Sequence, residues 1–446
     1  MLMRITHQKS RLDHFSHRPR ATRLLDVSTS VSIATAIRTS GHRAGTASYR
    51  RLVIAMMGGG LANFSLMYFV QPLLPLLADT YQVSPAESAH ALSITTLTII
   101  AGLLVAGPLS DRFGRVRLMR WSLVGSGLLG LASAFATSWP MLLACRGLMG
   151  ITLAWLPAAA LAYLREEVHP ASHGRANAAY IAGTAIGGVT GRLLPGPLAA
   201  LGGWTATAAS MSVLTLSAGA ITWLLLPTAT GFTPHKVSLR EVALGTITAP
   251  LDRVLGWVCL AGFAAMGTFV AVYNAMAFRL QAAPFSLGHA ATLVYLAYPI
   301  GITAPSLLRR WAERIGRGRT AAAASLLLIA ATVVASIPSL AAVMIGLGML
   351  TFGFLGIHSL LSGWVVSRAE REGLGTAQAS SAYLLTYYLG STIAGSLATV
   401  LWQGGGWGGV EILTSGLGVA ALIAVTVAGR RDQHDTAPAG EHPAHL

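Results

Sequence analysis

The sequence contains little charge for its length. Only 11% of its 446 residues are Asp, Glu, Lys or Arg, and 53% are hydrophobic, whereas soluble domains carry about 25% charged residues. A water-soluble chain of this length would lack the polar side chains needed to cover its surface. The shortage of charge therefore indicates a membrane protein, and only helices or closed barrels span a bilayer.

Cysteine is also scarce, and motifs of catalysis are missing. Cys145 and Cys259 fall in apolar runs far apart in the sequence, so we interpret them as small core residues rather than as a disulfide or metal site. The nucleotide-binding pattern Gly-x-x-x-x-Gly-Lys-Ser/Thr is absent, as are nucleophile motifs and metal-ligand clusters. These absences argue against an ATP-driven pump and an enzyme, and they predict no cofactor and no metal.

The first fifty residues contain no long apolar run. Residues 1–50 are rich in Arg, Ser and Thr and poor in acids, so they lack the apolar region of a secretory signal. Their composition is superficially similar to that of an organellar transit peptide. We interpret them as a basic, disordered cytoplasmic tail, with an upstream start that the cell does not use as the alternative.

Long apolar runs occupy the remainder of the chain. They are continuous rather than alternating, which favours helices over a barrel, and each is close to the roughly 20 residues that a span needs. The predicted fold class is an all-α membrane protein with about twelve transmembrane helices. The predicted spans are 52–77, 87–109, 118–137, 140–163, 177–199, 204–226, 254–279, 288–308, 320–337, 339–362, 377–400 and 409–428. The predicted organisation is a six-helix half at 51–226, a cytoplasmic linker at 227–252, a second six-helix half at 253–430 and a cytoplasmic tail at 431–446.

The net charge of +15 is placed unevenly along the chain. Basic residues gather in the even-numbered connections and after the last span, whereas the odd-numbered connections carry almost none, with Arg279 as the main exception. This alternation predicts that the even connections and both termini are cytoplasmic, and it argues against nucleic acid as a partner. The basic residues concerned are Arg112, Arg115, Arg117, Arg120, Arg165, Arg175, Lys236, Arg240, Arg253, Arg309, Arg310, Arg314, Arg317, Arg319, Arg368, Arg371, Arg430 and Arg431.

A basic turn occurs twice in the sequence. Residues 107–117 read Gly-Pro-Leu-Ser-Asp-Arg-Phe-Gly-Arg-Val-Arg, and residues 309–319, which lie 202 positions later, read Arg-Arg-Trp-Ala-Glu-Arg-Ile-Gly-Arg-Gly-Arg. The triplet Gly-Gly-Trp at 202–204 likewise recurs at 405–407, 203 positions later. Repeats at nearly one offset predict two pseudo-symmetric halves related by an axis along the membrane normal.

The first turn resembles a signature of the major facilitator superfamily, Gly-x-Leu-x-Asp-Arg-x-Gly-Arg, which lies between the second and third spans of that family. The resemblance extends over nearly all of 51–430 and is closest to bacterial inner-membrane efflux permeases of the twelve-span drug:proton antiporter branch. It implies a monomeric secondary transporter in the lipid bilayer of the bacterial inner membrane, with protons and a small molecule as its partners. The matching residues are Gly107, Leu109, Asp111, Arg112, Gly114 and Arg115.

By this resemblance the first turn is a conformational latch that closes the cytoplasmic side. Asp111 can accept hydrogen bonds from backbone amides, and the dipole of a neighbouring helix would stabilise its charge by about 0.3–1 kcal/mol. The proposed latch consists of Gly107, Asp111, Arg112, Gly114 and Arg115. The alternative is that the arginines only enforce topology. Arg309 stands where the first turn has Gly107, so the second turn is predicted to be a basic anchor.

Two more elements are similar to motifs of the family. Pro72-Leu-Leu-Pro75 in the first span matches a Pro-x-x-Pro element, and Arg146-Gly-Leu-Met-Gly150 in the fourth span matches an Arg-x-x-x-Gly element. An arginine inside a span costs roughly 3 kcal/mol or more unless it meets a cavity or a partner. The resemblance places Arg146 near the central cavity, in proton coupling or substrate binding. The alternative is that its long stem lets it reach the outer interface.

The fifth span departs from the antiporter motif Gly-x-x-x-Gly-Pro-x-x-Gly-Gly. The chain keeps the spacing but has Gly188 in place of the proline and Arg192 in place of the final glycine, which weakens the case for antiport. Arg192 is a candidate for coupling or substrate binding, with snorkelling as an equal alternative. The glycines expected to allow close helix packing are Gly150, Gly183, Gly187 and Gly191.

A proton-coupled carrier needs a titratable group that the cavity can reach. Related antiporters have an acid in the first span, where this chain has Asn63. His358 in the tenth span is the best candidate, because histidine titrates near neutral pH and that span lines the cavity in the family. The alternative is a histidine hydrogen-bonded between helices, with Ser359 or Ser362 nearby.

Polar and aromatic residues on the expected cavity helices suit amphipathic organic molecules, although each could equally serve helix packing. They are Asn63, Tyr68, Gln71, Trp155, Tyr273, Asn274, Tyr383, Tyr387 and Tyr388. For Trp204, Trp402 and Trp407, at outer ends of spans, an interfacial belt is the expected role.

The sequence thus predicts a secondary transporter, with proton-coupled efflux of a drug-like molecule or a sugar by alternating access as the preferred function. The first alternative is a proton-coupled uptake symporter of the same fold. The second is a membrane sensor or scaffold that has lost transport.

Overall fold

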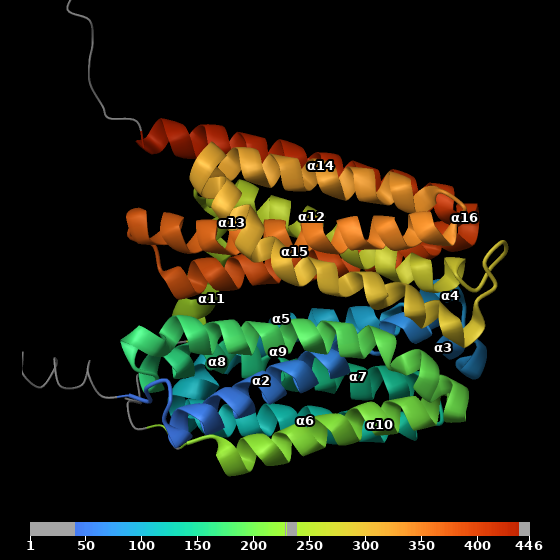
Figure 1. Ribbon diagram of the computed structural model, residues 1–446, viewed down its shortest axis with the longest axis horizontal. Coiled ribbons are helices and arrows are strands. Elements are labelled where there is room, and N and C mark those ends of the chain that lie inside the picture. Colours follow the sequence, from blue (N-terminus) through green and yellow to red (C-terminus); the bar gives the residue numbers. More distant parts are fainter. Residues whose placement is uncertain (1–40, 228, 230–238, 437–446) are drawn as a thin grey trace, which may run out of the picture.

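The computed structural model describes residues 41–227, 229 and 239–436, and every element named in this part of the chain is helical. Figure 1 shows two layers of helices, with the N-terminal half (blue to green) below the C-terminal half (yellow to red). The first half contains α2 (Ala47–Tyr68), η1 (Gln71–Leu73), α3 (Leu74–Tyr81), α4 (Pro85–Ser88), α5 (His90–Phe113), α6 (Arg115–Ala134), α7 (Trp139–Leu153), α8 (Trp155–Glu167), η2 (Pro170–Ser172), α9 (His173–Leu193) and α10 (Pro195–Leu225). The linker and second half contain α11 (Leu239–Thr248), η3 (Ala249–Leu251), α12 (Leu255–Arg279), η4 (Gly288–Thr303), α13 (Ala304–Ile315), α14 (Arg317–Ser336), α15 (Leu340–Arg371) and α16 (Thr376–Thr436).

The helices account for the twelve predicted spans. Within the described residues, nine helical segments are long and apolar enough to cross a membrane. The longest of them, α16, is broken by non-helical angles at Gly406 and so supplies two spans. The remaining two are α6 and α9, which have 20 and 21 residues but more polar character. The predicted all-α, twelve-span fold is confirmed.

The ends of the two halves differ from the predicted boundaries. The first helix begins at Ala47, and the backbone of His42 exchanges hydrogen bonds with Glu167 and His169, so the segment just before the helix is ordered against the first half. The helix α16 continues to Thr436, beyond residue 430. Residues 1–40 of the predicted tail at 1–50 lie outside the described residues.

Backbone geometry repeats between the halves. Gly114 and Gly316, in the two basic turns, have φ values of 88° and 92° with ψ of 147° and 149°. Gly203 and Gly406 have φ values of 62° and 61° with ψ of −148° and −150°. These are positive-φ conformations that glycine tolerates best, which explains why glycine stands at each position. We call the side that carries Gly114 and Gly316 the basic side, and the side that carries Gly203 and Gly406 the opposite side.

Two tryptophans tie the helices at the opposite side in the same way in each half. The indole nitrogen of Trp204 donates to Ser133 O at 3.0 Å, and that of Trp407 donates to Ser336 Oγ at 2.7 Å. Trp204 is buried and stacks on Phe69. The expected interfacial role is therefore wrong for Trp204, because its ring fills the core and satisfies a carbonyl at the end of a neighbouring helix.

Glycines bring α9 against α2 at van der Waals distance. A Cβ added at Gly183, Gly187 or Gly191 would lie 2.2, 2.3 and 2.7 Å from carbonyl oxygens of α2. No side chain fits at these three positions. The close packing of two backbones holds the next residue, Arg192, beside the end of α2.

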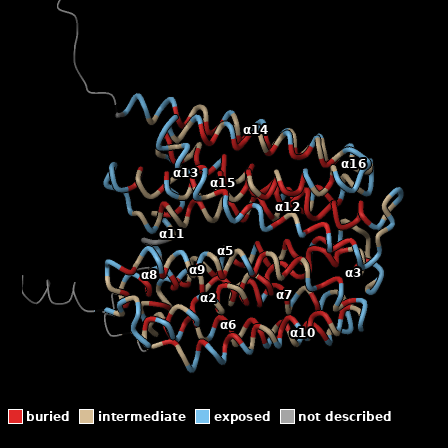
Figure 2. The backbone as a smooth tube through the Cα atoms, viewed as in Figure 1, coloured by how far each residue is buried: buried red, intermediate tan, exposed pale blue. Residues whose placement is uncertain are grey.

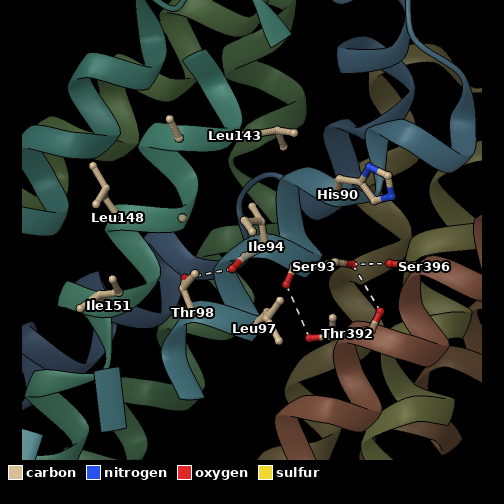
Figure 3. A pocket seen from close by; sticks show the side chains of 12 residues that line it. His90, Ser93, Ile94, Leu97, Thr98, Leu143, Leu148, Ile151, Thr392 and Ser396 are labelled. Carbon is tan, nitrogen blue, oxygen red and sulfur yellow. Dashed lines mark hydrogen bonds between the residues drawn. The ribbon is translucent and has the colours of Figure 1, made fainter. Parts of the chain in front are cut away.

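The two halves meet at the opposite side. Gln71 Nε2 donates to Asn274 Oδ1 at 2.9 Å, and these residues are 203 positions apart, so they are equivalent in the two halves. Two hydroxyl pairs, Ser93–Ser396 at 2.7 Å and Thr96–Thr392 at 2.8 Å, join α5 to α16, and Figure 3 shows the first of them. These contacts close the structure on this side.

Ion pairs on the basic side lie within one half. Arg115 binds Glu166 with Nε–Oε1 and Nη2–Oε1 distances of 2.7 and 2.6 Å. Arg368 binds Asp252 with an Nη2–Oδ2 distance of 2.9 Å. The structure is therefore held together across the halves at the opposite side and within each half at the basic side.

Asp252 also caps α12, because its Oδ1 accepts hydrogen bonds from two backbone amides at the start of that helix. Burial alone would raise the pKa of Asp252, but its hydrogen bonds with Arg368 and with these amides hold the pKa below its ordinary value. A carboxylate with a lowered folded pKa stabilises the fold at all pH values above its unfolded pKa, about 3.9. That contribution is lost as the pH falls through the folded pKa.

We expect Asp252→Asn to lower the stability of the purified protein by roughly 1 kcal/mol near neutral pH, because the helix cap and ion pair are weakened. The stability of the variant should also fall less than that of the wild type on acidification. Thermal unfolding in detergent at a series of pH values measures both effects. Asp79→Asn, at an exposed carboxylate, is the control and should follow the wild type. Equal stability of Asp252→Asn and wild type at neutral pH would contradict the interpretation.

We expect Asn274→Leu, which keeps the side-chain shape but removes the amide, to weaken the junction of the halves. Loss of one buried hydrogen bond costs about 1 kcal/mol in a membrane protein. The ratio of molecules whose halves are apart at the opposite side to molecules whose halves are joined there then rises roughly fivefold. Spin labels at Leu201 and Ile412, which are 83% and 77% exposed, report the distance between halves at the opposite side. Thr399→Val, whose hydroxyl bonds within its own helix, should leave that distance distribution unchanged. An unchanged distribution in Asn274→Leu would show that the Gln71 pair does not hold the halves together.

Candidate functional site

The candidate site is built around Arg192, near the C-terminal end of α9. Its side chain is fully buried, so the snorkelling alternative is wrong. Nε donates to Gln71 Oε1 and Nη1 donates to Gly188 O, both at 3.0 Å. Nη2 has no hydrogen-bond partner among the described residues.

Aromatic rings surround the Arg192 guanidinium. The Cζ atom lies 4.3 Å from the ring centre of Tyr68, 4.9 Å from those of Tyr273 and Tyr298, and 5.5 Å from that of Phe269. Tyr68 belongs to the first half and the other three rings to the second. A ring face attracts a cation by about 0.5–2 kcal/mol, so this cage partly offsets the cost of burying the charge.

The cage is fixed by packing within the second half. Tyr273 Oη shares a hydrogen bond with Thr351 Oγ1 at 2.7 Å. Tyr295 stacks on Tyr273 at 5.3 Å. Tyr295 and Tyr298 lie three residues apart in the 3₁₀ helix η4, a spacing that puts both side chains on one edge.

A line of rings leads from the cage to His358 on α15. Phe269 stacks on Phe354 with centroids 4.1 Å apart and an interplanar angle of 18°. Phe354 lies 6.1 Å from the His358 ring, and Tyr387 lies 4.7 Å from it. We call these rings the aromatic belt, which consists of Tyr68, Phe269, Tyr273, Tyr298, Phe354, Tyr383 and Tyr387.

His358 is hydrogen-bonded between helices. Its Nδ1 lies 2.8 Å from Tyr383 Oη on α16. The serine that was expected as a neighbour is engaged elsewhere, since Ser362 Oγ donates to Ser359 O. The structure thus shows the alternative in which His358 is hydrogen-bonded between helices, and its role in proton coupling stays a prediction.

His358 occupies an unusual position among the titratable groups. It lies midway along α15, whereas the other described histidines lie at helix ends or in connections. The described Asp and Glu residues likewise lie within about two turns of a helix end or break. Within the described chain, His358 is therefore the histidine that lies midway along a span.

Arg146 makes a different set of contacts. It is fully buried, and its guanidinium donates to three carbonyl oxygens, Ala91 O at 2.9 Å, Leu66 O at 3.3 Å and Met67 O at 3.1 Å. Two of these carbonyls belong to the last turn of α2, which has no helical donors for them, and a cation is favoured at that end of a helix. Snorkelling is wrong here too, and the geometry describes a cap that holds α2 where it breaks.

The structure brings together most of the other predicted candidates. Gln71 and Asn274 pair beside Arg192, Tyr273 joins its cage, and Tyr383 and Tyr387 lie against His358. Asn63 is buried on α2 with Oδ1 unpaired among the described atoms, and no recorded contact joins it to the belt. Gly150 packs against α5, where a Cβ would lie 2.3 Å from Thr95 O.

Sequence reasoning missed three members of the aromatic belt. Phe269, Tyr298 and Phe354 are single rings within apolar runs, where an aromatic residue is ordinary. No local pattern distinguishes them from core residues. Glu166, the partner of Arg115, was also missed, since an acid at the end of a span is common.

The latch residues lie within the first half. Asp111 Oδ1 lies 3.8 Å from Arg115 Nη1, and Arg115 also binds Glu166 and Ser110. Arg112 lies over the ring of Phe113, and a Cβ at Gly107 would meet no atom within 4 Å. A contact of this turn with the second half remains a prediction for a state closed on the basic side.

A hollow opens beside the seam between the halves. Its volume is about 760 Å³, and it lies between α5, α7 and α16. Apolar side chains such as Ile94, Leu97 and Leu148 form most of its wall, while Ser93 and Ser396 lie at the seam (Figure 3). None of its lining residues belongs to the aromatic belt.

The distribution of buried residues shows which helices are enclosed. Figure 2 shows buried residues along most of α12 and on the facing sides of α2, α7 and α9. The helix α12, which carries Phe269, Tyr273 and Asn274, is thus enclosed on nearly all sides. These three side chains contact residues of the first half.

Comparisons with known proteins agree with this architecture. The model of the Major Facilitator Superfamily matches residues 56–379. The chain is 36% identical over 369 residues to the uncharacterized MFS-type transporter YybF of Bacillus subtilis, covering 82% of this chain and 91% of that protein. It is 34% identical over 388 residues to the inner membrane transport protein YnfM of Escherichia coli, covering 87% and 92%.

Solved structures share the fold. A bacterial homolog of the human lysosomal transporter Spinster, in an inward-facing and unoccupied conformation, superposes with a TM-score of 0.66 at 17% identity, covering 89% of this chain and all of that one. The family match and the two relatives span most of the chain. The chain therefore belongs to the Major Facilitator Superfamily, and it is a multi-pass membrane protein and secondary transporter, not an enzyme.

Proposed function

We propose that this transporter couples proton movement to the export of a small organic compound, drug-like or a sugar, by alternating access. The observation that carries the proposal is the mid-span position of His358, hydrogen-bonded to Tyr383 and packed on Tyr387 at the end of the aromatic belt. A carrier driven by protons needs such a group, because the proton must bind between the two sides of the membrane. The helix α9 keeps the glycine spacing of the antiporter motif, with Gly188 and Arg192 in place of its proline and final glycine.

The proposed setting is the bacterial inner membrane, with a monomeric chain and both termini in the cytoplasm. The basic residues gather on the side of Gly114 and Gly316, as positive-inside topology requires. The match to an inner membrane transport protein of Escherichia coli supports this setting. The structure, closed on the opposite side, then corresponds to a state that faces the cytoplasm.

In the proposed cycle the two halves rock about the aromatic belt. The neutral His358 ring has one donor and one acceptor nitrogen, whereas the protonated ring donates through both. Protonation thus makes Tyr383 Oη an acceptor and places a positive charge beside Tyr387. This change at the site alters its affinity for an organic substrate, and it thereby links the movement of protons to the movement of substrate.

The proton gradient is sufficient for this work. One charge that moves through 100 mV provides about 2.3 kcal/mol. This free energy sustains roughly a fifty-fold substrate gradient. One proton per substrate is therefore enough for useful export.

We expect His358→Gln to abolish proton movement coupled to substrate, because glutamine keeps a hydrogen bond to Tyr383 but does not titrate. A pH-sensitive dye inside proteoliposomes, screened against a compound panel, measures the coupled flux. Downhill substrate movement should continue in the variant. The control His289→Gln, at the N-terminal end of η4, should retain coupling. Proton flux as fast in His358→Gln as in wild type would assign the coupling to another residue.

We expect Asp111→Asn to slow transport severalfold while leaving substrate affinity nearly unchanged, because the latch acts on the change of state rather than on binding. Initial rates and dissociation constants in the same proteoliposomes separate the two effects. Glu313→Gln, at the aligned position in the second turn, should transport at the wild-type rate. If Asp111→Asn also transports normally, the latch hypothesis is wrong.

A further inference from the structure

The Arg192 guanidinium is a buried charge without a counter-ion. The structure records no carboxylate paired with it in the described part of the chain, and Nη2, which is inaccessible to solvent, has no acceptor. A buried donor that lacks its partner is costly, and more so when it carries a charge. Ring faces compensate only part of this cost, and they leave the N–H hydrogens of Nη2 unused.

The cover over Arg192 is supplied by the other half of the molecule. Tyr273, Tyr298 and Phe269 all belong to the second half, whereas Arg192 and Gln71 belong to the first. When the halves separate at the opposite side, these rings leave the guanidinium. Arg192 then faces the opened space while its bond to Gln71 keeps it in place.

Separation also releases a second donor. Gln71 Oε1 accepts from Arg192 while its Nε2 donates to Asn274 across the junction. Once Asn274 moves away, Gln71 Nε2 loses its acceptor, on the same amide whose Oε1 binds Arg192 Nε. Two donors on hydrogen-bonded side chains, one of them charged, then have no acceptor, and such donors bind a carboxylate or a similar oxyanion.

The surroundings specify the remainder of the ligand. Tyr68 stays with the first half, 4.3 Å from the guanidinium, and the belt continues through Phe269 and Phe354 toward His358. Ring faces of this kind accommodate an aromatic or flat apolar body. A free inorganic anion would use the donors but not the rings.

We propose that Arg192 Nη2 and Gln71 Nε2 form an anion subsite, and that the substrates are organic anions with an aromatic body that lies along the aromatic belt. The subsite exists in the state that is open on the opposite side, where the exported anion is released, and the re-formed cage of Tyr273, Tyr298 and Phe269 keeps the anion from being carried back. This inference rests on the proposed transport function, because it names the substrate class of the same site.

The test compares aryl carboxylates with their neutral amides: 2-naphthoate with 2-naphthamide, and indole-3-acetate with indole-3-acetamide. Binding is measured as stabilisation against thermal unfolding over a concentration series, and transport as flux in proteoliposomes with the internal pH recorded. We expect the wild type to bind each carboxylate at least about tenfold more tightly than its amide. Arg192→Gln should remove this preference, and Arg192→Lys should keep part of it. Arg310→Gln, which removes an exposed positive charge, should retain the full preference.

Several outcomes would overturn the inference. Equal affinity of the wild type for acids and amides would do so without relying on any variant, as would a preference that survives in Arg192→Gln. If amides are transported with proton movement and carboxylates are not, the anion subsite is wrong while the proposed function stands. If neither series binds, moves or shifts the internal pH, the anion inference is wrong, and the proposed function is decided separately by the compound panel used with His358→Gln.

Discussion

The bilayer offers no hydrogen-bonding partner to a polar group, so each one inside it must find a partner within the protein or lose free energy. The arginines of this transporter show how the fold answers that requirement. Arg146 supplies donors to carbonyls that the break in α2 leaves without helical partners. Trp204 and Trp407 do the same for groups at the ends of neighbouring helices. Where the requirement is met, the polar residue belongs to the scaffold.

Arg192 is the position where the requirement is met only in part. Two of its nitrogens have acceptors, the third has none among the described residues, and four rings surround the guanidinium. The missing acceptor for Nη2 is a free-energy cost of the closed junction, and residues from both halves compensate only part of it. A partly satisfied group at a boundary that must open and close is well suited to bind something else when the boundary opens.

The pseudo-symmetry explains both what repeats and what does not. Gln71 and Asn274 are equivalent residues that meet each other across the axis, so one hydrogen bond serves both halves. The position equivalent to Arg192 in the second half is Gly395, whose carbonyl accepts from Asn274. On the basic side, Arg115 binds Glu166 in the first half, whereas the equivalent Arg317 donates to Ser367 in the second. The candidate site at Arg192 thus lies where the copies differ.

The sequence determined the class of the molecule by itself. Scarcity of charge, runs of about twenty apolar residues, a repeated basic turn and the placement of arginines require a duplicated helical bundle in a membrane, because each is a local or periodic property. Candidates such as Arg192, Gln71, Asn274, His358 and Tyr383 were visible too, as polar or aromatic residues inside apolar runs.

Tertiary structure alone decided which of these candidates act together. Arg146 and Arg192 look alike in sequence, yet one meets three carbonyls and the other a cage with an unused nitrogen. Phe269, Tyr298 and Phe354 have no sequence signal, because a single ring in an apolar helix is ordinary until its partners are known. The contacts that define the site join helices up to two hundred residues apart, and the packing of α9 on α2 and of α12 between the halves sets those distances.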